Sequence, residues 1–297
     1  MEKVVLPSLA KINLGLEVLG SREDGYHEII TLFQTVGIAD RVKFSLRSDG
    51  KIIITGNRSD VPWDESNLIS RAARLLQQES GCPCGTEVKV AKNIPPGRGL
   101  GGGSSNAAVT LIALNRLWQV NFSLEQLVML GASLGADVPY FFYGGLCLGR
   151  GKGDRLEQLS DPGARWVLLA IPDFAVSTAA IYGEFDKEVE FLTSRDKASK
   201  IIQFLETEDQ ALIRHLENEL EFVAFKIHPQ LAEIKKALLE SGAELSLMSG
   251  SGSAVYGLFV DKAKARRAAR KLASGYQVCL AETVNRELYR QMLITGA

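Results

Sequence analysis

Two side chains and one loop in this sequence are suited to transferring a phosphoryl group. The loop is the glycine-rich stretch at residues 93–106, where glycine lets backbone N–H groups approach a ligand and the helix that follows offers its N-terminus to an anion. Lys11 can supply a point charge, and Asp137 can orient or deprotonate an acceptor hydroxyl. Phosphoryl transfer needs a held phosphate, a cation and a positioned hydroxyl, so these residues together predict that class of chemistry.

The glycine stretch comes close to two nucleotide-binding motifs and satisfies neither. Its glycines have the spacing of the dinucleotide fingerprint, but the region about 20 residues on, where that motif needs an acid, indicates a helix start with the capping box Ser123 and Gln126. Gly97 and Gly102 also have P-loop spacing, yet Gly103 stands where a P-loop has lysine. We therefore expect a different phosphate loop whose cation comes from elsewhere in the chain. A glycine-rich hinge or plain helix start is the less favoured alternative.

Composition limits the other possibilities. The 297 residues are 46% apolar and 23% charged, which is typical of a soluble globular protein with one large or two ordinary domains. A net charge of −1 leaves no broad basic surface for nucleic acid or an anionic membrane. No apolar run approaches the roughly 18 residues of a membrane span, and the N-terminal apolar run is too short for a signal peptide, so we expect a cytoplasmic location.

The four cysteines do not indicate a metal site. They lack the paired CxxC spacing of zinc sites, and reduced thiols are expected. Cys82 and Cys84 flank Pro83 and could form a metal or redox pair, but no histidine is near them in sequence, so an ordinary loop is favoured.

The elements that must position the reactive groups begin with strands. Alternation around Lys11 and Asn13 places both side chains on one face of a strand, and the turn signal at residues 22–25 predicts a hairpin with Tyr26 and His27 near its tip. The first part of the chain is therefore predicted to be a mainly antiparallel sheet. Its expected strands are residues 6–19, 27–36, 41–46, 51–55 and 86–91.

Helices in this part are predicted from capping residues and helical periodicity. Ser104 or Ser105 is expected to cap the helix after the glycine loop, and this helix should pack on the sheet. Its apolar face carries Ala107, Leu111, Leu114 and Trp118. The other expected helices are residues 67–78 closed by Gly81, residues 124–134 ended by Gly135, and a short helical or turn segment at 136–142 that begins near Asp137.

Beyond a soft boundary near residue 155, strands and helices alternate. The glycine-rich residues 144–154 break the pattern there and predict two domains, 1–155 and 156–297, with a final helix at about 284–297 that could return to the first. The expected strands are residues 166–171, 244–248, 254–260 and 276–284, and the expected helices are residues 196–205, 209–216, 229–240, 262–273 and 286–292.

Three stretches resemble the signature motifs of the GHMP small-molecule kinases. They are residues 7–14 (PSLAKINL), 96–107 (PGRGLGGGSSNA) and 248–253 (MSGSGS), in the expected order along nearly the whole chain. Within that family, residues 24–28 (DGYHE) and 135–139 (GADVP) resemble members that use ATP to phosphorylate a cytidyl diphosphate sugar alcohol for isoprenoid precursors. The resemblance implies an α+β fold of two lobes, with mixed and antiparallel sheets packed against helices and both ligands in the cleft between the lobes.

The resemblance also implies a role for each matching residue. Lys11 and Asp137 are the implied catalytic pair, acting on the C2 hydroxyl of the acceptor. ATP binding is implied for Pro96, Gly97, Gly99, Leu100, Gly101, Gly102, Gly103, Ser104, Ser105, Asn67 and Asn106. Acceptor binding is expected for Asn13, Tyr26, His27, Thr178, Tyr182, Gly250, Ser251 and Gly252. Tyr26 and Tyr182 suit stacking on a pyrimidine, whereas residues 249–253 could equally be an ordinary hairpin loop.

Mg²⁺ is the implied metal. Ser104 offers the one plausible hydroxyl ligand, and ATP oxygens and water would supply the rest. The sequence leaves open which of Arg22, Lys92, Arg98 and Lys152 contacts the substrate diphosphate, and whether the chain is a monomer or a weak dimer.

Two alternatives remain beside this interpretation. A related kinase acting on homoserine or a mevalonate-type alcohol would not need the Tyr26–His27 pair. A nucleotide-binding sensor without catalysis would not need both Lys11 and Asp137.

Overall fold

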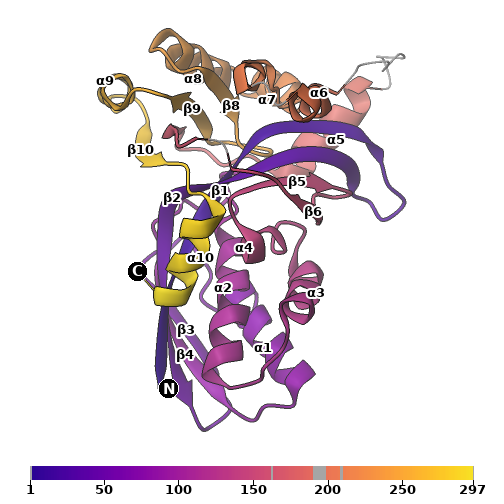
Figure 1. The fold of residues 1–297 in the computed structure, drawn as a ribbon, viewed down its shortest axis with the longest axis vertical. Helices are drawn as coiled ribbons and strands as arrows, with labels where there is room; N and C mark the ends of the chain where they lie inside the picture. The colour runs from indigo at the N-terminus through magenta and orange to yellow at the C-terminus, as the bar shows by residue number, and fades with distance from the viewer. Residues whose placement is uncertain (1, 162, 190–198, 208–209, 297) are drawn as a thin grey trace.

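A long antiparallel ribbon runs through the computed structural model, which describes residues 2–161, 163–189, 199–207 and 210–296. Strand β1 (Lys3–Ser21) pairs with β2 (His27–Arg47) along nearly its whole length. Figure 1 shows the two strands, at the indigo end of the colour scale, passing from one half of the molecule into the other. The predicted hairpin is confirmed. The strand predicted separately at residues 41–46 is the far end of β2.

The ribbon is widened into one mixed sheet by different strands at its two ends. At one end, β4 (Gly85–Ala91) pairs antiparallel with β2 and parallel with β3 (Ile52–Gly56), which confirms both predicted strands. At the other end, β5 (Leu146–Arg150) pairs with β2, and β6 (Arg155–Gln158) pairs with β5.

The prediction that residues 144–154 merely break the pattern was wrong, because β5 starts inside this stretch. The first four residues of β5 are buried, so the strand lacks the alternation of apolar and polar residues that marks a half-exposed strand. Glycines on both sides of this short strand further weaken the sequence pattern that would predict it.

Helices α1 (Leu68–Ser80), α2 (Gly102–Leu117), α3 (Leu124–Leu134) and α4 (Tyr140–Tyr143) cover one face of this sheet (Figure 1). The predicted apolar face of α2 is confirmed, since Ala107, Leu111 and Leu114 are fully buried in the core beneath it. The capping box that starts α3 and the left-handed Gly81 that ends α1 are also as predicted.

The prediction that Ser104 or Ser105 caps α2 was wrong. The helix begins earlier, because Gly101 adopts a left-handed conformation with φ of +67° and serves as the N-cap residue without a side-chain hydrogen bond. Both serines therefore lie within the first turn. The Ser105 hydroxyl instead accepts a hydrogen bond of 2.7 Å from the buried hydroxyl of Ser8 on β1.

A second sheet is antiparallel throughout and has the strand order β10-β7-β9-β8. Its strands are β7 (Trp166–Ile171), β8 (Leu245–Met248), β9 (Val255–Phe259) and β10 (Gln277–Glu282), and all four were predicted. Side chains on alternate positions of β7 point to opposite faces: Val167 and Leu169 pack against the first sheet, whereas Leu168 and Ala170 pack against helices. The two sheets thus share one core.

The helices of the second half are α5 (Thr178–Val189), α6 (Lys200–Thr207), the 3₁₀ helix η1 (Gln210–His215), α7 (Glu221–Ile227), α8 (Pro229–Glu240) and α9 (Lys262–Leu272). The predictions for α8 and α9 are confirmed. The helix predicted at residues 196–205 begins outside the described residues, as does the one predicted at 209–216, whose described part is 3₁₀ rather than α. Helices α5 and α7 were not predicted, because α5 contains Gly183 and α7 has only 7 residues.

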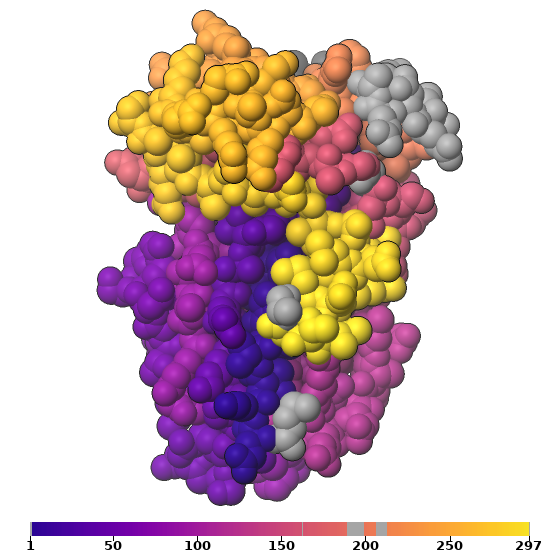
Figure 2. All heavy atoms as spheres, turned by 60° about the vertical axis from the view of Figure 1, so that its left-hand side comes forward, coloured from indigo at the N-terminus to yellow at the C-terminus, as the bar shows by residue number. Residues whose placement is uncertain are grey.

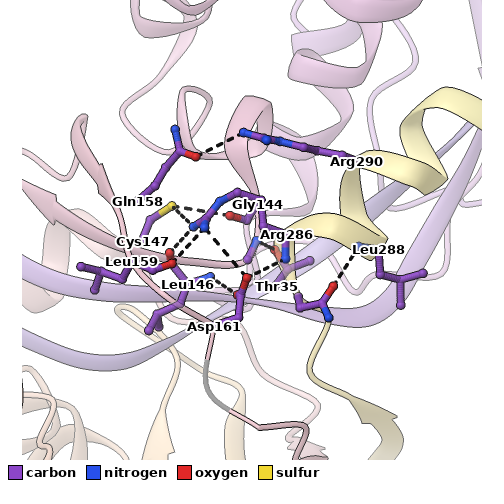
Figure 3. Close-up of polar contacts among 12 residues, drawn as sticks. Thr35, Gly144, Leu146, Cys147, Gln158, Leu159, Asp161, Arg286, Leu288 and Arg290 are labelled. Atoms are coloured by element: carbon purple, nitrogen blue, oxygen red, sulfur yellow. Dashed lines mark hydrogen bonds and ion pairs between the residues drawn. The ribbon is translucent and has the colours of Figure 1, made fainter. Parts of the chain in front are cut away.

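The last helix, α10 (Arg286–Thr295), lies beside β1 in the half of the molecule that holds α1–α4. Figure 2 shows this yellow segment against the indigo N-terminal strand. The buried Tyr289 phenol donates a 2.6 Å hydrogen bond to the carbonyl of Phe141 in α4. Figure 3 shows the Arg286 guanidinium reaching the carbonyls of Leu146 and Leu159, while the Asp161 carboxylate accepts the N–H groups of Arg286 and Leu146.

None of the helices in the described ranges combines the length and the apolar character needed to cross a membrane. Cys82 and Cys84 lie in the loop between α1 and β4, as predicted, and they are not joined by a disulfide.

Candidate active site

A cavity of about 720 Å³ brings together segments from both halves of the chain. Its walls come from β1, the tip of the β1–β2 hairpin, the glycine loop before α2, the turn before α4, helix α5 and the loop between β8 and β9. The predicted site residues that line it are Lys11, Asn13, Tyr26, His27, Gly97, Gly99, Gly101, Ser104, Asp137, Thr178, Tyr182, Gly250, Ser251 and Gly252. Residues far apart in the sequence therefore face one space.

The predicted catalytic pair is assembled at the wall of this cavity. The Lys11 ammonium lies 3.4 Å from a carboxylate oxygen of Asp137, which sits in the turn between α3 and α4. The Lys11 side chain is 4% exposed and that of Asp137 is 34% exposed. A buried cation thus faces a carboxylate that remains accessible to a ligand.

A chain of hydrogen bonds fixes the orientation of the Lys11 side chain. Its ammonium donates to the Asn13 side-chain oxygen at 2.7 Å, the Asn13 amide donates to the Thr31 hydroxyl at 2.8 Å, and that hydroxyl donates to the carbonyl of Gly15 at 2.7 Å. The ammonium also lies 5.3 Å from the centre of the Phe33 ring. Irregularities in the β1–β2 register flank residues 11–13, and such bulges re-aim side chains near functional sites.

The glycine loop approaches its neighbours closely at positions 99 and 101, where it has no side chain. Gly99 and Gly101 both have positive φ angles, and an added Cβ on Gly101 would lie 2.9 Å from Cγ of Lys11. The carbonyl of Leu100 accepts the backbone N–H of Lys11 at 3.0 Å. The loop and the strand that bears Lys11 are therefore directly hydrogen-bonded.

A cluster of buried polar side chains binds the start of the glycine loop. This cluster was not predicted from the sequence. The Asp40 carboxylate pairs with the Lys92 ammonium and accepts the backbone N–H groups of Asn93 and Ile94 at 2.7 and 2.8 Å. The Asn106 amide donates to the same carboxylate at 2.9 Å. Since Asp40 lies inside a long strand, no local motif marks it. Burial lowers the pKa of Lys92 despite this pairing.

Several predicted ATP-binding residues do not line the cavity. Asn106 is 4% exposed and uses its amide within the buried cluster, and Asn67 caps α1, where its side-chain oxygen accepts the N–H of Ile69 at 3.0 Å. The others outside the lining are Pro96, Leu100, Gly102, Gly103 and Ser105. Of these, Leu100 packs in the core between the sheets.

The other end of the cavity is aromatic and contains a contact between a histidine and a carboxylate. The His27 ring stacks on the Tyr182 ring with 4.5 Å between the centroids, and His27 Nε2 lies 2.8 Å from a carboxylate oxygen of Asp186. Burial, reinforced by the Asp137 carboxylate, raises the pKa of the Tyr182 phenol, so it stays neutral. The Thr178 and Ser251 hydroxyls are 2.7 Å apart. Asp186 was missed because α5 itself was not predicted.

The sequence left open which of four basic residues contacts the substrate diphosphate, and in the structure these residues have different surroundings. Arg22 pairs with Asp24 and Glu28, Lys92 with Asp40, and Arg98 donates to the Ser253 hydroxyl and the Asp173 carbonyl. Lys152 lines the cavity, with its ammonium 4.8 Å from the Tyr26 ring centre and 3.9 Å from an Asp154 oxygen. Of these four residues, Lys152 is therefore the one that lines the cavity.

The residues present suit Mg²⁺ held mainly by a nucleotide. Within the described residues, no group of three or more histidine, cysteine, aspartate or glutamate side chains could hold a metal. The cavity does contain the Ser104 hydroxyl and the accessible Asp137 carboxylate, and Mg²⁺ commonly takes few protein oxygens together with phosphate and water oxygens.

Comparison with known proteins finds two family models and curated relatives that match this chain. Residues 67–145 match the GHMP kinases N terminal domain, and residues 196–278 match the GHMP kinases C terminal. A 4-diphosphocytidyl-2-C-methyl-D-erythritol kinase from Syntrophus aciditrophicus is 44% identical over 268 residues, covering 90% of this chain and 93% of the relative. One from Pelotomaculum thermopropionicum is 41% identical, covering 94% of this chain and 97% of the relative.

Solved structures give the same result for the fold. A crystal structure of 4-(cytidine 5'-diphospho)-2C-methyl-D-erythritol kinase is similar with a TM-score of 0.78 and 35% identity, covering 94% of this chain and 99% of that one. Homoserine kinase from Cytophaga hutchinsonii has a TM-score of 0.75 at 19% identity over 97% and 96% of the two chains. The second likeness concerns the fold alone.

Proposed function

Because this chain belongs to the GHMP kinase family, we propose that it transfers the γ-phosphoryl group of ATP to the C2 hydroxyl of 4-diphosphocytidyl-2-C-methyl-D-erythritol, a step toward isoprenoid precursors. The observation that carries this proposal is the Lys11–Asp137 pair, whose charged atoms are 3.4 Å apart between a glycine loop and an aromatic pocket. Such a pair lies where a nucleotide phosphate and an acceptor hydroxyl would meet.

The glycine loop holds the ATP phosphates in this mechanism. Backbone N–H groups at the start of α2 and the positive end of the helix dipole favour the anion. Lys11 supplies the charge that a P-loop lysine supplies elsewhere, stabilising negative charge on the phosphoryl group during transfer. The Ser104 hydroxyl, together with ATP oxygens, would hold Mg²⁺, which would supply further positive charge to the phosphates.

Asp137 acts on the acceptor. Its carboxylate orients the C2 hydroxyl and accepts its proton as the oxygen bonds to the γ-phosphorus, while the bond from that phosphorus to the bridging oxygen breaks and ADP leaves. Because Lys11 also touches Asn13, the lysine keeps its position when Asp137 turns toward the hydroxyl.

The aromatic end of the cavity selects the cytidyl group. Tyr26, His27 and Tyr182 offer ring faces to a pyrimidine, and stacking adds about 0.5–1.5 kcal/mol beyond area burial. Lys152 is placed to meet the diphosphate between the base and the alcohol. In this proposal residues 1–155 form the ATP-binding domain and residues 156–297 the substrate-binding domain, with the hairpin tip of the first domain reaching the acceptor.

Two observations disfavour the alternatives. A homoserine or mevalonate-type acceptor has no base to stack, so the His27–Tyr182 pair and the extended aromatic end would serve no purpose. A non-catalytic sensor would not require an accessible carboxylate opposite a buried lysine.

The proposal is tested by offering the protein ATP, Mg²⁺ and a panel of alcohols that contains the cytidyl substrate, homoserine and mevalonate. Mass spectrometry and ³¹P NMR identify the phosphorylated product. We expect product from the cytidyl substrate alone. Product from homoserine or mevalonate would favour a sibling activity, and ATP binding without any product would favour the sensor.

A further inference from the structure

The loop between β8 and β9 presents its backbone to the catalytic lysine. Gly250 has a φ of +57°, and a Cβ added there would lie 3.5 Å from the Lys11 ammonium. Ser251 and Gly252 line the same cavity. At its two glycines, this loop can offer a ligand only main-chain groups, so the orientation of its peptides matters.

One buried amide sets that orientation. Asn218, which is 3% exposed, donates to the carbonyl of Met248 at 2.8 Å and to the carbonyl of Gly250 at 2.7 Å. Its side-chain oxygen accepts the N–H of Leu220 at 3.0 Å. Both N–H bonds of the amide are used, which fixes its rotamer and holds the two carbonyls toward the protein interior.

The carbonyl and the N–H of a trans peptide point in opposite directions. Because the Gly250 carbonyl points at Asn218, the Ser251 N–H of the same peptide points away from it, on the side where Ser251 lines the cavity. Within the described part of the chain, no acceptor takes this N–H. By contrast, the Gly252 N–H is bonded to the Ser249 carbonyl at 3.0 Å.

The segment that carries Asn218 also binds the lysine-bearing strand. Leu16 of β1 donates its N–H to the Glu217 carbonyl and accepts the N–H of Glu219, both at 2.9 Å. The Glu221 carboxylate accepts the N–H of Met248 at 2.7 Å. Residues 217–221 thus join β1 to the β8–β9 loop and set the position of Lys11 relative to Gly250.

We propose that Asn218 is a positioning residue for the reaction: it aims the Ser251 N–H at an oxygen of the phosphoryl group in transfer, beside the Lys11 ammonium. This inference rests on the kinase function proposed above. Asn218 touches no reactant itself and acts through the Gly250–Ser251 peptide. Removing its two donors frees that peptide to rotate, and a preorganised donor to the transferring group is lost.

Steady-state kinetics with the cytidyl substrate test the proposal. Asn218→Asp keeps the shape but replaces the donating nitrogen by oxygen, and Asn218→Ser keeps one short donor. We expect Asn218→Asp to lower kcat by at least about tenfold, which is a modest share of the loss typical for a missing oxyanion donor, while the KM for ATP changes less than about twofold. Lys235→Met is the matched control, because Lys235 pairs with Glu221 on the outside of the same segment. It should lose stability and keep kcat.

NMR of the wild-type protein gives a second test that does not depend on whether the variants fold. With ADP, aluminium fluoride and the cytidyl substrate, the amide proton of Ser251 should shift strongly downfield while that of Gly252 stays in place. An unmoved Ser251 amide, or a folded Asn218→Asp protein with wild-type kcat, would overturn the inference and leave the kinase function intact. A wild-type protein that does not phosphorylate the cytidyl substrate would overturn both.

Discussion

A Cβ atom added to Gly99 would lie 1.9 Å from the carbonyl oxygen of Ser249. The glycine loop and the β8–β9 loop therefore touch backbone to backbone, and the Ser249 hydroxyl donates to the Gly99 carbonyl at 2.8 Å. Two motifs that lie far apart in the sequence are built against each other. A side chain at position 99 would push them apart, since real Cβ atoms do not approach a carbonyl oxygen so closely.

Gly99→Ala should therefore disturb both stability and ATP binding. Alanine at a positive φ costs about 1–2 kcal/mol, and the clash with Ser249 adds about 1–3 kcal/mol. Gly97→Ala is the matched control, because Gly97 has a φ of +66° and nothing lies within 4 Å of its added Cβ. Thermal unfolding and ATP titration of the two variants separate the clash from the backbone strain. Equal losses in both would show that the contact with Ser249 is unimportant.

Asp137→Asn and Lys11→Ala should each lower kcat by at least about a hundredfold while ATP still binds. In the proposed mechanism, the first removes the group that accepts the hydroxyl proton, and the second removes the cation at the transferring phosphate. Steady-state assays with the cytidyl substrate and calorimetric ATP titration measure the two effects. Asp49→Asn, which changes an exposed acid paired with Arg47, is the control and should keep wild-type turnover. Undiminished kcat in either site variant would exclude that residue from the mechanism.

Tyr182→Ala should weaken binding of the acceptor and leave binding of ATP unchanged. Loss of a stacked ring is expected to raise the KM for the cytidyl substrate by about tenfold, which corresponds to about 1.4 kcal/mol. Tyr182→Phe is the matched control, because the half-buried phenol is neutral and the ring alone stacks on His27. Initial-rate measurements at varied acceptor and ATP decide the matter. An equal rise in the KM for ATP would place Tyr182 outside an acceptor-specific role.

Local patterns predicted much of this fold from the sequence. The β1–β2 hairpin, the capping box at Ser123 and the apolar face of α2 each depend on residues close together in the chain, and all three are present. The expected placement of Lys11 and Asn13 on one face of a strand is also seen, with their side chains hydrogen-bonded. The periodicity of apolar residues and the capping of helices depend on residues close together in the chain. They can therefore be predicted without knowing the tertiary contacts.

The misses have a common cause in long-range contacts. Strand β5 is defined by its pairing with β2, and its sequence lacks the alternation of apolar and polar residues that would predict a strand. Asp40 reaches Lys92 only because β2 and the end of β4 lie side by side, and Asn218 reaches the Gly250 carbonyl from a segment without a motif. The start of α2 depended on Gly101 adopting a positive φ, which sequence alone does not specify. Buried polar contacts between distant segments carry no local pattern.

Glu221 should make stability depend on pH. Burial raises the pKa of this carboxyl despite its pairing with Lys235 and its bond from Met248, so the folded protein binds the Glu221 proton more tightly than the unfolded chain does. Stability contributed by the protonated form is present below the usual carboxyl pKa of about 4.3 and is lost as pH rises through the folded-state value. Glu221→Gln keeps an acceptor for the Met248 N–H and does not titrate, so its stability relative to wild type should increase as pH rises above about 4.3 in urea-unfolding experiments. Glu240→Gln, at an exposed acid near Lys236, is the control and should stay parallel to wild type. If the free energy of unfolding of the wild-type protein instead increases relative to that of Glu221→Gln as pH rises, attraction to Lys235 outweighs the cost of burial.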